Sequence, residues 1–179
     1  MKKFLALCLM GVMLFAMTGC GEEEKDVVQD DLIQYVETDL PAIKGDEATA
    51  VNRYNEVSAG IADMDRKTIL SAFNDEIIPS YTTFYNNLMN LSVATEEVKA
   101  LKETYVEGAK LQLEGMTALS KAIQDNDSEA AQAANEQIAQ GKTKIEQHRS
   151  DITKLASEHN ISIKTADSTQ AEATTEAAE

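Results

Sequence analysis

The last third of the chain before its C-terminal tail carries a stripe of residues spaced four and three positions apart. The stripe consists of Ala134, Ile138, Gly141, Ile145, His148, Ile152, Leu155 and His159. Steps of four and three bring side chains to one face of an α-helix, whereas a half-buried strand would need alternation. The sequence therefore predicts one long helix here, with a narrow face buried against other helices.

Three earlier segments repeat this helical periodicity. They carry Val28, Leu32, Val36, Leu40, Ile43, Ala50, Tyr54, Val57 and Ile61 in the first; Phe73, Ile77, Tyr81, Phe84, Leu88 and Leu91 in the second; and Val98, Leu101, Tyr105, Ala109, Gln112, Met116, Leu119 and Ile123 in the third. Between the segments, Gly60 can end the first helix. The N-cap candidates are Asp65 for the second helix, Ser92 or Thr95 for the third, and residues 125–128 for the fourth. Short connections make neighbouring helices antiparallel. The predicted fold is all-α, an up-down-up-down four-helix bundle over residues 26–163; three helices plus a kinked hairpin is the alternative.

Two prolines interrupt the helical pattern. Pro79 falls near the middle of the second segment, where its missing N–H and its ring predict a kink. Pro41 falls inside the first segment, so proline-kinked helices are expected in both. An alternative for Pro41 is a break near residue 39, with Thr38 or Asp39 capping a new helix that has the proline in its first turn.

The N-terminus has the organisation of an export signal. Met1-Lys2-Lys3 is positively charged, and residues 4–17 are apolar apart from Gly11. This run is shorter than the roughly 20 residues that span a bilayer. Met17-Thr18-Gly19-Cys20 resembles the lipobox of bacterial lipoproteins. The resemblance implies that residues 1–19 are a cleaved signal peptide and that the Cys20 sulfur carries a diacylglyceryl group.

The remaining segments complete the expected domain organisation. Residues 20–25 form a lipidated spacer that includes Glu22, Glu23 and Glu24. Residues 164–179 contain five Ala, four Thr and three Glu, without aromatic residues, Leu, Ile or Val. Such a segment buries too little apolar area to offset the entropy of ordering it, so a disordered tail is predicted.

Composition excludes one class of function. The chain has 16 Lys+Arg against 31 Asp+Glu, a formal net charge of -15. This charge has the wrong sign for attraction to phosphates, so no nucleic-acid partner is expected.

Gln112 and His148 are the candidate ligand-binding residues. Both fall on predicted inward faces, where Gly108, Gly115 and Gly141 let helix backbones approach or leave space for a small polar cavity. The alternative is that His148 is a hydrogen-bonded core residue and Gln112 lies at the solvent edge.

No metal site, cofactor or catalytic machinery is expected. The histidines lack the Glu-x-x-His spacing of di-iron bundles. Residues 125–136 place acids as in a calcium loop, but Ala130 stands where the turn needs glycine, so the cluster is interpreted as helix capping. No glycine-rich phosphate loop, G-x-S-x-G or H-E-x-x-H motif occurs.

These patterns predict a non-catalytic, lipid-anchored, extracytoplasmic protein. The chain resembles small helical lipoproteins of Gram-positive bacteria, which favours attachment to a cytoplasmic membrane over an outer membrane. We expect a binding or scaffolding module with an envelope protein as its partner. The alternative is a small-ligand carrier that uses a polar cavity at Gln112 and His148.

Overall fold

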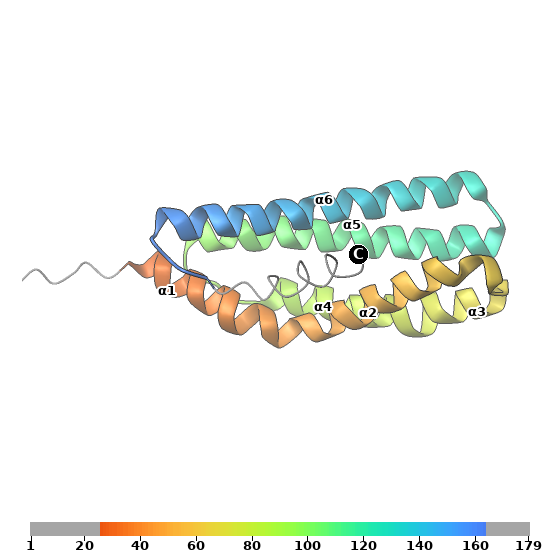
Figure 1. The fold of residues 1–179 in the computed structure, drawn as a ribbon, viewed down its shortest axis with the longest axis horizontal. Helices are drawn as coiled ribbons and strands as arrows, with labels where there is room; N and C mark the ends of the chain where they lie inside the picture. The colour runs from red at the N-terminus through yellow and green to blue at the C-terminus, as the bar shows by residue number, and fades with distance from the viewer. Residues whose placement is uncertain (1–25, 164–179) are drawn as a thin grey trace, which may run out of the picture.

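The computed structural model describes residues 26–163, which are helical apart from short connections (Figure 1). The elements are α1 (Val27–Gln34), η1 (Tyr35–Asp39), α2 (Leu40–Gly60), η2 (Ile61–Asp63), α3 (Arg66–Ser71), η3 (Ala72–Ile77), α4 (Ile78–Asn90), α5 (Glu96–Asp125) and α6 (Ser128–Glu158). Here η1 and η3 are π-helical and η2 is a 3₁₀ turn. With no strand between residues 26 and 163, the predicted all-α class is confirmed. The predicted signal peptide, Cys20, the spacer up to residue 25 and the tail 164–179 lie outside the described residues.

The elements form four helical stretches that lie side by side (Figure 1). The first runs from α1 to η2, the second from α3 to α4, and α5 and α6 are the third and fourth. Each stretch joins the next at alternating ends of the molecule. The packing is uneven, because α6 packs along α5 whereas α2 packs mainly on η3 and α4.

Capping residues mark where the second, third and fourth stretches begin. Asp65 caps α3 by accepting a hydrogen bond from the Thr68 N–H, and Asp127 caps α6 through the Ala130 N–H. Of the two candidates for α5, the structure uses Thr95, whose hydroxyl oxygen accepts from the Val98 N–H. The acidic cluster before α6 thus caps a helix, as its sequence indicated.

Asp31 of α1 ties the first stretch to the start of α5. Its carboxylate accepts hydrogen bonds from the backbone N–H groups of Ala94 and Thr95, at 3.0 and 2.8 Å, and from the Thr95 hydroxyl at 2.7 Å. Hydrogen bonds to a charged acceptor are stronger than neutral ones. One side chain therefore holds both the loop and the N-cap of α5 against α1.

A π-helical segment precedes each proline. The Leu40 N–H bonds to the Tyr35 carbonyl, and the Ile78 N–H bonds to the Phe73 carbonyl, both five residues back. The wider turn shifts the hydrogen-bond register immediately before Pro41 and Pro79, so each proline follows without ending its helical stretch. The first stretch changes direction where η1 meets α2 (Figure 1).

The predicted alternative for Pro41 holds in part: α2 begins at Leu40 with the proline in its first turn, but the expected side-chain cap is not made. Asp39 has helical backbone angles and makes no side-chain capping bond. Its carboxylate accepts from the Gln34 amide at 2.9 Å instead. The chain stays helical through this region because the π segment already adjusts the backbone ahead of Pro41.

Glycines set the close approach of α5 and α6. A Cβ at Gly141 would stand 2.7 Å from the Gly108 carbonyl oxygen and 2.6 Å from the Gln112 Cγ, and one at Gly115 would stand 2.6 Å from the Ile138 Cγ1. Real Cβ atoms do not come this near. The two helices therefore touch through backbone at these levels.

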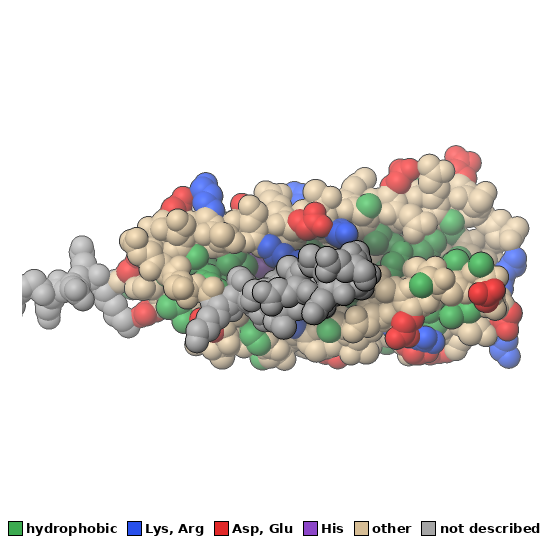
Figure 2. Space-filling view, in the orientation of Figure 1, with side chains coloured by type: hydrophobic (Ala, Val, Ile, Leu, Met, Phe, Trp, Pro, Cys, Tyr) green, Lys and Arg blue, Asp and Glu red, His purple; other side chains and the backbone are tan. Residues whose placement is uncertain are grey.

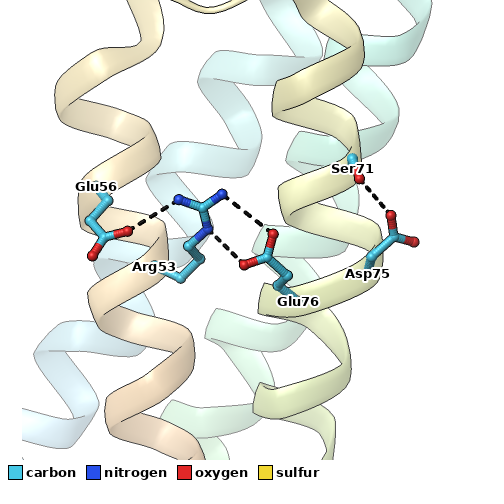
Figure 3. A network of polar contacts seen from close by, with 5 residues as sticks. All are labelled: Arg53, Glu56, Ser71, Asp75 and Glu76. Atoms are coloured by element: carbon cyan, nitrogen blue, oxygen red, sulfur yellow. Dashed lines mark hydrogen bonds and ion pairs between the residues drawn. The ribbon is translucent and has the colours of Figure 1, made fainter.

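The second stretch is joined to the first by a surface ion-pair group (Figure 3). The Arg53 guanidinium of α2 donates to both carboxylate oxygens of Glu76, at 2.8 and 3.3 Å, and to Glu56 on its own helix at 3.1 Å. Ser71 donates to Asp75 at 2.6 Å within the second stretch. Exposed pairs of this kind contribute little stability, but the bidentate contact fixes the register of α2 against η3.

Candidate functional site

His148 lies in the core between two tyrosines. It is 2% exposed, and a hydrogen bond of 3.1 Å joins its Nε2 to the Tyr35 hydroxyl. The Tyr105 ring stacks on the imidazole, with ring centroids 4.4 Å apart. Burial, followed by the charges of Lys44 and Arg149, lowers the pKa of His148 to about 3. The imidazole is therefore neutral at physiological pH.

Glu47 of α2 is a carboxylate that bonds to this aromatic group. The Tyr105 hydroxyl donates to its Oε2 at 2.6 Å. Burial raises the pKa of the Glu47 carboxyl, although the Tyr105 hydrogen bond and the charges of Lys44 and Arg149 act in the opposite direction. Burial also raises the pKa of Tyr105. The tyrosine therefore stays protonated and donates to the carboxylate.

Gln112 belongs to the same buried layer. The Tyr81 hydroxyl donates to its Oε1 at 2.7 Å. An edge-on ring contact joins Tyr81 to Phe84, and a tilted one joins Phe84 to Tyr105. Every buried side-chain nitrogen or oxygen in residues 26–163 has a hydrogen-bond partner. Gln112 and His148 are thus both core residues with protein partners, and the ligand contacts suggested for them stay a prediction.

A second feature is an open apolar pocket between α2 and α6, near the α5–α6 turn. Its volume is about 350 Å³. Figure 2 shows hydrophobic side chains in the hollow between these two helices. The pocket forms because α6 packs on α5 while α2 packs on α4. The space between α2 and α6 is therefore left unfilled. Its lining consists of Tyr54, Val57, Ser58, Ile61, Phe73, Leu119, Ile123, Ala131 and Asn135.

The pocket has a buried aromatic floor and a polar mouth. Phe73 is buried in η3, and its ring meets the half-buried Tyr54 ring edge-on at 5.9 Å. The Tyr54 hydroxyl reaches the Asn135 side-chain oxygen at 3.5 Å across the mouth. No lining residue is charged. The lining therefore offers apolar contact and hydrogen bonds to a bound molecule.

The pocket lies far from the first described residue. Asp26 caps α1 and contacts the Nδ1 of His159 at 2.6 Å, so both ends of the described chain meet at one end of the bundle. Residues 131 and 159 are separated by nearly the whole length of α6. At about 1.5 Å per residue, the pocket stands about 40 Å from that end.

The described part of the chain offers neither a membrane span nor a metal site. Residues 26–163 contain no helix with the length and apolar character needed to cross a membrane. Nor do these residues bring together three or more His, Cys, Asp or Glu side chains in a way that would hold a metal ion.

Sequence reasoning missed the pocket residues Tyr54, Ser58 and Asn135. The sequence pattern places Tyr54 on the core face of the first helix, which is where it lies. Its contact across the mouth depends on how α2 and α6 are spaced. No local pattern encodes that spacing. An available signal was the alanine content of residues 130–139. Alanine side chains are small, so this part of the fourth helix does not fill the space toward the first.

Comparison with known proteins gives a family and no closer relative. No curated protein and no solved structure matches the chain. The sequence model of the family described as Uncharacterised lipoprotein PM1805 matches residues 29–160, which covers all four helical stretches. The chain therefore belongs to this family of uncharacterised lipoproteins.

Proposed function

We propose that the protein is a non-catalytic binding module, held at the outer face of a bacterial membrane through acyl chains on Cys20. Membership of a lipoprotein family supports the anchor in general terms. The lipobox-like Met17-Thr18-Gly19-Cys20 supplies the acceptor residue. Two acyl chains hold a protein stably at a membrane, whereas one holds it marginally. The resemblance to Gram-positive lipoproteins favours the cytoplasmic membrane of such a bacterium.

The observation that carries the binding role is the open pocket at the far end of the bundle. Cys20 lies six residues before Asp26, so an anchor there would tether the end of the bundle where α1 begins. The pocket would then face away from the membrane, about 40 Å further out. A rigid helical rod with a pocket at its outer end is suited to meeting a partner in the envelope.

The anchor is tested by fractionation of cells that express the chain with Cys20→Ser. We expect the variant to leave the membrane fraction while the wild-type chain stays in it. A Cys20→Ser chain that had lost residues 1–19 and still remained membrane-bound would refute the anchor.

The binding role is tested by a photocrosslinking residue at Ser58, which is exposed and lines the pocket. The control is the same residue at Thr117, which is exposed on α5 outside the lining. In intact cells we expect position 58 to capture a defined envelope species that position 117 does not. Equal capture at both positions would contradict a role for the pocket.

A further inference from the structure

We infer that the pocket between α2 and α6 binds a small, uncharged, ring-containing molecule that has at least one hydrogen-bonding group. This inference rests on the proposed binding role and specifies the class of ligand. The volume of about 350 Å³ lies within the range of small-molecule sites.

The absence of charge in the lining selects an uncharged ligand. Charged residues make up 26% of the chain, yet none of them lines the pocket. Moving an ionic group from water into an apolar site without a partner is costly. A charged ligand would therefore lose more hydration free energy than its contacts with the pocket would supply.

The aromatic floor favours a ring. Tyr54 and Phe73 already meet edge-on, with ring centroids 5.9 Å apart. A third ring placed against them would extend the same packing, which adds to the gain from buried area. Because Phe73 is held in the π-helical segment η3 and is 2% exposed, this floor is formed before any ligand arrives.

The mouth supplies hydrogen bonds that the protein does not use itself. The Ser58 hydroxyl and the Asn135 amide nitrogen make no hydrogen bond within residues 26–163. The Tyr54 hydroxyl contacts Asn135 only at 3.5 Å. A ligand with one polar group at its edge would find a donor and an acceptor here while its ring stays on the apolar floor.

A protein partner fits the same surface less well. In residues 26–163 the exposed large hydrophobic side chains are Val27, Ile61 and Met89. Only Ile61 borders the pocket, whereas Val27 and Met89 lie at the opposite end of their helical stretches. Stable protein interfaces have a contiguous apolar centre, and these scattered residues do not provide one.

The test uses N-phenyl-1-naphthylamine, an uncharged amine that carries a phenyl ring and a naphthalene ring system and whose fluorescence rises in apolar surroundings. Its counterpart, 8-anilinonaphthalene-1-sulfonate, has the same rings and an added sulfonate. Both are titrated into residues 20–179 carrying Cys20→Ser, so that neither acyl groups nor the apolar run 4–17 contributes. We expect one saturable site for the uncharged dye and binding of the sulfonate at least about tenfold weaker. Absence of a saturable site, or equal binding of the two dyes, would overturn the inference.

Two matched substitutions place the dye in the pocket. Ala131→Leu fills the lining from α6, and Ala139→Leu makes the same change at an exposed position two turns along the same helix. We expect the first to weaken binding by about tenfold or more and the second to leave it within about twofold. Ser58→Leu fills the pocket from an exposed position on α2 and serves if Ala131→Leu lowers the melting temperature. Equal affinity in the filling and control variants would refute the assignment.

The result also separates this inference from the proposed function. If the dye fails to bind but a crosslinker at Ser58 captures one envelope protein, the binding role stands and the small-molecule ligand is wrong. If the dye binds and no protein is captured, the pocket serves a small molecule.

Discussion

The contact between α5 and α6 yields the sharpest prediction, because it depends on a missing side chain. Gly141→Ala would place a Cβ 2.7 Å from the Gly108 carbonyl oxygen, 2.9 Å from the Gln112 backbone nitrogen and 2.6 Å from the Gln112 Cγ. Two of these three atoms belong to the facing backbone, so a rotamer change cannot relieve the clash. The two helices must separate locally.

The magnitude follows from two opposing effects. Overpacking a well-packed core costs about 1–3 kcal/mol, and rigid backbone contacts place this site near about 3 kcal/mol. Alanine gains about 1 kcal/mol over glycine in helix propensity. The net loss in the free energy of unfolding is therefore about 2 kcal/mol. At roughly 4 °C per kcal/mol, the melting temperature should fall by about 8 °C.

Gly45→Ala is the matched control. Gly45 is exposed in α2, and a Cβ there would meet nothing within 4 Å. Only the propensity gain remains, so this variant should be more stable than wild type by about 1 kcal/mol. Urea unfolding followed by circular dichroism measures both changes. A Gly141→Ala protein as stable as wild type would refute the close approach of α5 and α6.

Two further predictions concern polar groups. Between pH 6.5 and about pH 3, His148 binds a proton in the unfolded chain but not in the native protein. His148 should therefore lower the free energy of unfolding as the pH decreases, by about 1.4 kcal/mol per pH unit. Urea unfolding near neutral pH and near pH 5 should show a larger loss of unfolding free energy in wild type than in His148→Phe. An equal loss in the two proteins would contradict a neutral, buried His148. Asp31→Ala removes the acceptor for Ala94 and Thr95 and should cost about 2 kcal/mol in the same assay. An unchanged unfolding midpoint would show that this contact does not hold α5.

The helices were predictable because their signals are local. The spacing from Ala134 to Leu155 indicated α6, and Asp65 and Asp127 marked helix starts by ordinary capping chemistry. Ile138 is half-buried and packs against the core, close to Gly115 of α5. His159 ends the stripe at the C-cap, where it bonds Asp26 instead of entering the core.

The π-helical segments and the site could not be predicted in the same way. A proline in a helix predicts an irregularity, but the wider turn before Pro41 and Pro79 depends on packing that holds Tyr35 and Phe73 in place. Likewise, Gln112 and His148 fell on inward faces as expected, whereas their tyrosine partners come from other helices. The pocket arises from unequal helix spacing, which is a property of the whole bundle.

The central claim is that this bundle works while tethered through Cys20. Intact-mass and peptide mass spectrometry of the protein purified from its native membrane tests it most directly. The account predicts a chain that begins at residue 20, with a diacylglyceryl group on the cysteine sulfur. An unmodified Cys20, or a chain that still carries residues 1–19, would contradict it.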